Sequence, residues 1–151
     1  MSDVIQTTNF PGLRLVHRGK VRDIYAIDGH DDKLLMVATD RISAYDVVME
    51  DPIPGKGQLL TRMSLFWFTL LGDIIENHLI TVNADQYPDA CRPYAEKLRG
   101  RSMLVKKTKP LPIECIVRGY ISGSFWSAYR KSTTVCGFTL PSGMKESEQF
   151  P

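Results

Sequence analysis

The stretch LRLVHRGKVRDIYAIDGHDDKLLMVAT, residues 13–39, decides the fold. It holds three runs of strand-prone residues, 13–17, 21–27 and 34–39, each about five residues long. A basic glycine turn separates the first two runs, and the turn-forming cluster DGHDD separates the last two. Strands this short joined by turns this tight predict an antiparallel meander.

A long helix is predicted farther along the chain. The segment PIPGKG, residues 52–57, cannot be regular structure because proline and glycine dominate it. From residue 58 to about residue 77 the sequence favours a helix, with apolar residues at three- and four-residue steps. One face carries Leu59, Met63, Phe66 and Leu70. A second apolar row lies beside it, so we expect this helix to be buried or covered by a partner.

The remaining segments are short. We predict strands over 79–82, 102–106 and 113–121, a helix over 89–98 interrupted by Pro93, a helix over 123–132, and a loop-like tail from residue 137. The expected fold class is α+β, with a mainly antiparallel sheet and flanking helices. We expect an N-terminal lobe over residues 1–110 and the start of a second lobe over residues 111–151.

Composition excludes several classes of protein. Of the 151 residues, 43% are hydrophobic and 24% charged, which is ordinary for a soluble globular protein, and the net charge of +2 provides no field for nucleic acid or an anionic membrane. The longest apolar stretch, 65–71, is too short to span a bilayer, and the first ten residues show no secretory signal. Three dispersed cysteines without a CxxC pair argue against zinc. We expect a cytoplasmic protein without nucleic-acid or membrane partners; the sequence leaves its oligomeric state open.

The turn between the first two strands is a candidate phosphate site. Gly19 lets a ligand approach the main chain closely, and Lys20 and Arg22 supply positive charge. A strand follows the glycine, as in the hairpins that cover ATP phosphates in kinase-like folds, whereas a Walker A loop is followed by a helix. The alternative is an ordinary hairpin with a solvated basic turn.

Two further loops carry polar residues in suggestive arrangements. DRISAYD, residues 40–46, follows a buried strand and contains Asp40, Arg41 and Ser43, although a capped turn would use the same residues. In PGKG, residues 54–57, Lys56 stands between two glycines and could reach an anion; a flexible connector is the alternative.

The segment LPIECIVRGYISGSFWSAY, residues 111–129, contains the fourth candidate. Arg118 lies on the predicted apolar strand, where a charge needs a partner, and Ser124 lies at the start of a predicted helix. An arginine beside a helix N-terminus is suited to phosphate. Pairing of Arg118 with Glu114, on the same face of the strand, is the structural alternative.

Together these motifs resemble the SAICAR synthetase (phosphoribosylaminoimidazole-succinocarboxamide synthase) family. The stretches that carry the resemblance are GKVRDIY at 19–25, TDRISAYDVVM at 39–49, PGKG at 54–57, SLFWF at 64–68 and LPIECIVRGYISGSFWSAY at 111–129. They span most of the chain, and the last is the most specific.

The resemblance implies an ATP-dependent ligase of purine biosynthesis that joins carboxyaminoimidazole ribotide and L-aspartate to give SAICAR, ADP and phosphate. The implied nucleotide-binding residues are Gly19, Lys20, Arg22 and Lys106. The implied substrate-binding residues are Arg118, Ser124, Asp40, Arg41, Ser43 and Lys56. ATP and Mg²⁺ are the implied cofactors.

Members of the family are longer, so the chain reads as an N-terminal portion, with acidic magnesium ligands expected in the C-terminal part and none in these residues. The other function that we considered is a catalytically incompetent nucleotide-binding fragment or interaction module.

Overall fold

The computed structural model describes residues 4–113 and 115–151. The chain forms two compact units, one ending at Lys109 and the other covering Pro110–Pro151. Each has its own cluster of buried apolar residues. Among the described residues, no helix is both long and apolar enough to cross a membrane.

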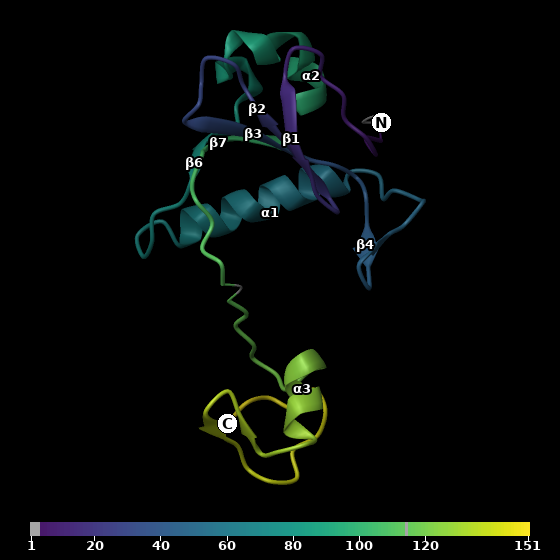
Figure 1. Cartoon of the computed structure of the whole chain (residues 1–151), viewed down its shortest axis with the longest axis vertical. Helices are drawn as coiled ribbons and strands as arrows, with labels where there is room; N and C mark the ends of the chain where they lie inside the picture. Colours follow the sequence, from purple (N-terminus) through teal and green to yellow (C-terminus); the bar gives the residue numbers. More distant parts are fainter. Residues whose placement is uncertain (1–3, 114) are drawn as a thin grey trace. The chain divides into compact units, whose positions relative to one another are not determined.

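The first unit is built on a five-stranded antiparallel sheet of order β1-β2-β3-β7-β6 (Figure 1). Its strands are β1 (Arg14–Arg18), β2 (Arg22–Ala26), β3 (Lys33–Ala38), β7 (Ser102–Lys106) and β6 (Leu79–Thr81). The predicted meander is therefore present as β1, β2 and β3. This sheet with its flanking helices confirms the predicted α+β class.

One face of the sheet carries the core of the unit. Tyr25, Leu35 and Leu104 lie side by side across three strands and are almost inaccessible to solvent. Three short helical segments cover them: η1 (Ala84–Gln86), η2 (Asp89–Tyr94) and α2 (Ala95–Leu98). The predicted helix over 89–98 is thus a 3₁₀ segment followed by one α-turn, because Pro93 has no N–H to donate.

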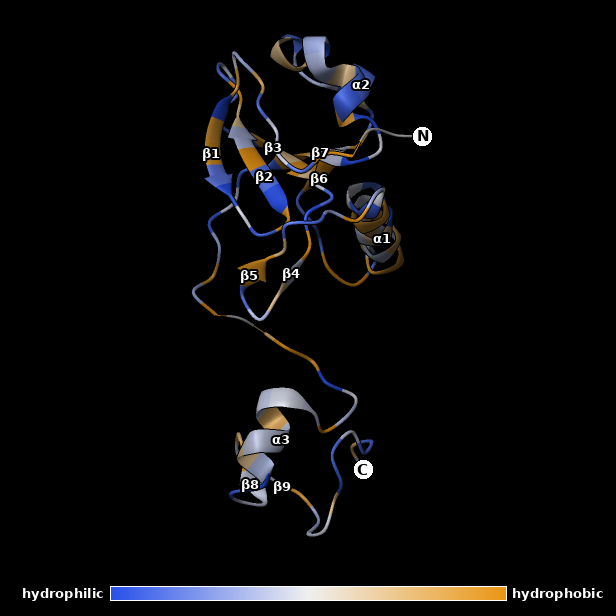
Figure 2. Ribbon diagram, turned by 90° about the vertical axis from the view of Figure 1, so that its right-hand side faces the viewer, coloured by the Kyte–Doolittle hydropathy of each residue, from blue (hydrophilic) through white to orange (hydrophobic). Residues whose placement is uncertain are grey.

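The opposite face of the sheet meets α1 (Lys56–Leu70), as Figures 1 and 2 both show. The helix ends seven residues earlier than predicted, and the chain turns at 71–75. Gly57 brings the helix against β3, because a Cβ there would stand 2.4 Å from the Ala38 carbonyl oxygen. Met103 and Val105 of β7 are buried on the same side of the sheet.

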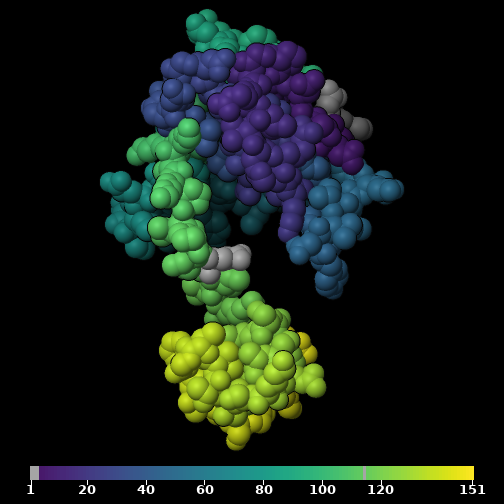
Figure 3. All heavy atoms as spheres, in the orientation of Figure 1, coloured from purple at the N-terminus to yellow at the C-terminus, as the bar shows by residue number. Residues whose placement is uncertain are grey.

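A small hairpin, β4 (Ser43–Ala44) and β5 (Val47–Val48), projects from the first unit (Figures 1 and 3). Its two turn residues, Tyr45 and Asp46, have φ angles of 49° and 65°, in the left-handed region. Sequence reasoning predicted a polar loop here and did not identify the hairpin.

The second unit contains α3 (Gly123–Tyr129) and a hairpin of β8 (Thr134–Val135) and β9 (Phe138–Thr139). Its core gathers around Ile121, Tyr129 and Val135. The predicted strand over 113–121 is wrong for the described residues, which form only an isolated bridge between Tyr120 and Gln149. Val117 is 98% exposed, so this β-branched run has no sheet on which to pack.

Candidate functional site

The turn between β1 and β2 is tightly closed. The Gly19 amide donates to the Arg22 carbonyl at 2.7 Å. A Cβ on Gly19 would stand 3.2 Å from that same oxygen, so a larger residue would push the turn open. The glycine at this position therefore keeps the turn compact.

Arg41 holds this turn from inside the protein. The buried guanidinium donates to the carbonyl oxygens of Gly19 at 2.8 Å and Lys20 at 3.2 Å, and to the Asp23 carboxylate at 2.6 Å. A trans peptide points its N–H opposite to its C=O. Because both carbonyls face Arg41, the amides of Lys20 and Val21 point away from it.

Two buried carboxylates complete this framework. Burial raises the pKa of Asp23, but hydrogen bonds from Arg41 and Thr8 outweigh it and bring the pKa below its usual value. Burial likewise raises the pKa of Asp40, and the amides of Ile5 and Gly57 together with Arg101 lower it further than burial raises it. Both carboxylates are therefore held ionised by partners within the protein.

Asp40 and Arg41 were expected to contact substrate, and the structure places them differently. Asp40 has no solvent exposure, and Arg41 is 6% exposed with its N–H groups bonded to main-chain and carboxylate oxygens. Their contacts position the turn and the start of α1. They therefore support the candidate site from beneath its surface.

Lys56 and Arg22 bring two positive charges together beside the turn. Lys56 is the first residue of α1, and burial followed by the nearby Arg22 charge lowers its pKa. Arg22 is half-buried and lies on the sheet face that meets α1, since strand residues alternate between faces and the side chains of Met103 and Val105 mark that face. Two neighbouring cations are mutually repulsive unless an anion lies between them.

Asp46 is the residue that sequence reasoning left out of the site. Its carboxylate forms an ion pair with the Lys20 ammonium, which joins the tip of the β4–β5 hairpin to the glycine turn. This hydrogen bond lowers the pKa of Asp46. The signal was present, because Asp46 ends the polar stretch that begins at Asp40, but nothing in the spacing indicated its partner.

Two other predicted residues lie apart from this group. Ser43 is half-buried on β4, at the base of the small hairpin. Lys106 pairs with Lys33 at the end of the sheet remote from Arg22, and strand alternation places its side chain on the opposite face. The structure thus gathers Gly19, Lys20, Arg22 and Lys56, and it separates Lys106 from them.

Arg118 and Ser124 meet in the second unit. One guanidinium nitrogen of Arg118 donates to the Ser124 hydroxyl at 3.3 Å, and Gly123 between them has a φ of 58°. Ser124 lies in the first turn of α3, at the start of the helix as predicted, and the N-cap residue is Ser122. Glu114, the alternative partner of Arg118, lies outside the described residues.

A hollow beside Arg118 has mainly apolar walls. Among the described residues that line it, Arg118 has the only charged side chain, and the others include Ile116, Phe125, Phe138, Leu140 and Phe150. A charged group in such surroundings favours an anionic ligand with an apolar portion.

The described carboxylates are not gathered into a cluster of metal ligands. No group of three or more His, Cys, Asp or Glu side chains gathers in residues 4–113 and 115–151. Asp23 and Asp40 already accept several N–H or O–H groups, and Asp46 pairs with Lys20. These carboxylates therefore do not fit a metal ion, which prefers several converging oxygen ligands.

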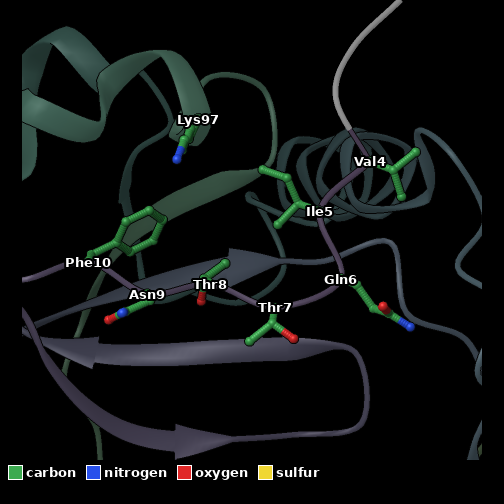
Figure 4. A pocket seen from close by; sticks show the side chains of 8 residues that line it. All are labelled: Val4, Ile5, Gln6, Thr7, Thr8, Asn9, Phe10 and Lys97. Carbon is green, nitrogen blue, oxygen red and sulfur yellow. The ribbon is translucent and has the colours of Figure 1, made fainter.

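A separate pocket lies along the N-terminal segment and includes none of the predicted site residues (Figure 4). It is lined by residues 4–10, with Lys97 approaching from α2. The Thr8 hydroxyl at its floor is already hydrogen-bonded to Asp23 and Tyr25. We assign this pocket no role.

Comparison with known proteins identifies relatives along the whole chain. The phosphoribosylaminoimidazole-succinocarboxamide synthase of Desulfotalea psychrophila is 70% identical over 151 residues, covering 100% of this chain and 51% of that protein. The synthase of Desulfosudis oleivorans is 61% identical, with 100% and 50% coverage. This chain therefore spans about half the length of the curated relatives that it matches.

Solved structures agree with these relatives. The SAICAR synthase from Saccharomyces cerevisiae, complexed with SAICAR, matches with a TM-score of 0.85 and 50% identity, covering 97% of this chain and 51% of that one. A type-2 SAICAR synthetase in complex with ADP matches with a TM-score of 0.64 and 26% identity, covering 89% and 46%. Because the family model for SAICAR synthetase also matches residues 15–151, the chain belongs to the SAICAR synthetase family.

Proposed function

We propose that this chain supplies the nucleotide-binding part and a ribotide-binding part of an ATP-dependent ligase of purine biosynthesis. The complete enzyme joins carboxyaminoimidazole ribotide to L-aspartate and releases SAICAR, ADP and phosphate. One related structure is a complex with SAICAR and another is a complex with ADP, which supports both ligand classes. Activity belongs to the longer protein, of which this chain covers about half.

The orientation of the Gly19–Lys20 turn is the observation that carries this proposal. Arg41 draws two successive carbonyls inward, so the following amides of Lys20 and Val21 point outward. Outward amides beside a lysine form an anion-binding concavity. Arg22 and Lys56 add positive charge on the same side as α1, so ATP phosphates are the anions that we place here.

The rest of the nucleotide follows the face of the sheet beside α1. Ile24 and Met36 are half-buried on that face, next to Arg22, and offer an apolar surface for the base. The ammonium of Lys106 lies on the other face, so we do not assign its side chain to the nucleotide. For this residue we propose only a main-chain contact near the base.

In the second unit we assign the ribotide phosphate to Arg118 and Ser124. The pair presents a guanidinium fork and a hydroxyl from positions that already contact each other. We place Ser43 near the amine substrate, because it lies on the β4–β5 hairpin whose turn residue Asp46 contacts Lys20.

The chemistry needs positioning and charge neutralisation more than a nucleophilic side chain. A carboxylate is a poor acyl donor, so ATP first converts it to an acyl phosphate, which the aspartate amine attacks with loss of phosphate. Lysine, arginine and main-chain amides stabilise the negative charge that develops during phosphoryl transfer. No step is assigned to Mg²⁺, whose ligands we expect in the C-terminal half.

The first test concerns Lys20. ATP binding is measured on the 151-residue chain and on an extended chain that carries the C-terminal half of the Desulfotalea psychrophila relative. We expect Lys20→Ala to weaken ATP binding roughly ten- to a hundredfold, the value of a hydrogen bond to a charged group. Lys131→Ala, an exposed lysine of the second unit, is the matched control. Equal ATP affinity in both variants would refute the assignment.

The second test separates the ribotide from the other substrates. Lysine keeps the charge of Arg118 but not its planar fork, so Arg118→Lys should raise the KM for the ribotide roughly tenfold or more in the extended enzyme. The KM for ATP should stay within about twofold. If the KM rises only for ATP or aspartate, Arg118 does not bind the ribotide.

A further inference from the structure

The outward side of α1 carries an apolar stripe. Leu59, Met63, Phe66 and Leu70 are 55%, 50%, 60% and 56% exposed, and Trp67 beside them is 51% exposed. The turn that follows adds Ile74 and Ile75, both more than half exposed. Figure 2 shows hydrophobic colouring along the ribbon of this helix.

This stripe lies opposite the side that packs on the sheet. Gly57 and Thr61 are buried and mark the inner side. At about 100° per residue, Leu59 is rotated roughly 200° from Gly57, and the four stripe residues fall within about 60° of one another. Gly57, Thr61 and the half-buried Phe68 lie on the inner side, whereas the four large apolar groups of the stripe face outward.

A contiguous apolar surface of this kind marks an interaction site on a soluble protein. A shallow groove follows it, lined by Arg62, Leu65, Phe66, Thr69 and Leu70. Arg62 is the only charged residue between Gly57 and Gly72. A helix that lies on a membrane surface carries several lysines and arginines along its polar side, whereas α1 has only Lys56 at its start and Arg62.

The length of the relatives indicates what covers the stripe. This chain corresponds to 51% of the Desulfotalea psychrophila protein and 51% of the yeast structure, so these relatives carry a further segment of similar length. A segment in the same polypeptide meets the stripe at high effective concentration and needs no charges for steering. A separate partner without charge complementarity would have neither a high effective concentration nor electrostatic steering toward the stripe.

We propose that the outer stripe of α1 (Leu59, Met63, Phe66, Trp67 and Leu70) is the docking surface for the C-terminal half that family members carry. Apolar groups of the C-terminal half would cover these side chains, which are exposed to solvent in the first unit. The proposal rests on exposure, spacing and chain length, and its tests need no catalytic activity.

Tryptophan fluorescence gives the first test. The 151 residues contain two tryptophans, so Trp126→Phe leaves Trp67 as the only tryptophan among them, and any tryptophan of the added half is changed to phenylalanine in the extended chain. We expect acrylamide to quench Trp67 readily in the 151-residue chain and at least threefold less in the extended chain. Hydrogen exchange of the α1 amides in the whole Desulfotalea psychrophila protein provides a second reading, in which slow exchange is expected.

Polar substitutions give the second test. The double change Phe66→Ser with Leu70→Ser should leave the unfolding midpoint of the 151-residue chain nearly unchanged, because both side chains are exposed there. The same change should lower the midpoint of the extended chain clearly. Thr69→Ser introduces serine into the same helix without removing a large apolar group, and should leave both chains unchanged.

Three results would overturn the proposal. Equal quenching of Trp67 in the two chains would mean that the C-terminal half does not cover the stripe. Equal effects of the double change in both chains would mean the same. Protection of Trp67 that rises with the concentration of the 151-residue chain, together with a dimer in sedimentation, would assign the stripe to a second copy.

Discussion

Arg41 is the residue on which the geometry of the glycine turn depends. It joins the turn carbonyls to the Asp23 carboxylate and also donates to the Gln6 carbonyl at 2.7 Å. Thr8 adds a hydrogen bond to the same carboxylate at 2.5 Å, so the N-terminal segment belongs to the same network. A change at a buried residue can therefore alter a turn at the surface.

Replacing Arg41 should be costly. Arg41→Ala leaves Asp23, which has no exposed surface, without its main charge partner, and we expect the free energy of unfolding to fall by about 3 kcal/mol. Arg92→Ala breaks an exposed pair with Asp89 and should cost less than about 0.5 kcal/mol. Urea unfolding of both variants measures the difference, and equal losses would contradict a structural role for Arg41.

His78 makes stability depend on pH in a defined direction. Burial lowers its pKa below 6.5, so the unfolded chain takes up the proton first. The contribution of the neutral ring is fully present above pH 6.5 and is lost as the pH falls below that value. His78→Phe keeps a ring against Phe68 and should flatten the stability curve below pH 6.5. An unchanged slope in thermal unfolding would show that other groups cause it.

For single residues, the sequence predicted the position of the candidate site more accurately than the role of each residue in it. It pointed to the loop of residues 40–46, but which acid turns inward depends on partners distant in the chain. Asp40 bonds Ile5, Gly57 and Arg101, and none of these pairings has a local signature. Asp46, two residues beyond Ala44, occupies the exposed turn instead.

Among the elements, α1 is a helix whose periodic apolar residues lie on its exposed side. Apolar residues at three- and four-residue steps usually mark the buried side of a helix. Here the fully buried positions are Gly57 and Thr61, because the helix approaches β3 closely at Gly57. The sequence therefore predicted the helix. It did not predict that the apolar stripe is exposed, because this depends on the packing of α1 against β3, which the sequence pattern does not show.

Gly57, the glycine of α1, should be sensitive to substitution. A Cβ there would stand 2.4 Å from the Ala38 carbonyl oxygen and 3.0 Å from an Arg101 nitrogen. Although alanine favours helices, we expect Gly57→Ala to destabilise the protein by about 1–3 kcal/mol, the usual cost of overpacking. Gly119→Ala meets nothing within 4 Å and serves as the control. Chemical denaturation compares the two, and a stabilised Gly57→Ala would contradict the close approach.

The segment 113–121 illustrates the opposite failure. Its β-branched residues favour a strand locally, but a strand needs a neighbour that supplies hydrogen bonds. Its described residues form one isolated bridge, between Tyr120 and Gln149, and backbone hydrogen bonds link only Gly119 and Ile121 to residues 147–150. Ile116 and Val117 are exposed. By contrast, the meander of residues 13–39 was predictable because its tight turns bring each strand to its neighbour.

At the scale of the whole molecule, the two units differ in the size of the apolar core that stabilises each of them. The first has a sheet core that includes Tyr25, Leu35 and Cys91, all nearly inaccessible, and the second has a small cluster around Ile121. The other two cysteines, Cys115 and Cys136, are exposed. The chain thus contains a thiol in its main core and two thiols at its surface.

Thiol reactivity should therefore report on the integrity of the main core. Burial raises the pKa of Cys91 to about 11, so at pH 8 this thiol is both protonated and shielded from reagent. We expect a disulfide reagent to modify two thiols quickly in the native chain and the third only as the core opens. Cys91→Ala should remove the slow phase and leave the fast phase intact. Increasing urea should accelerate the slow phase in parallel with unfolding measured by fluorescence, since modification then follows the population of the open core. Three equally fast thiols in the native chain would mean that the sheet and its helical cover do not form a closed core.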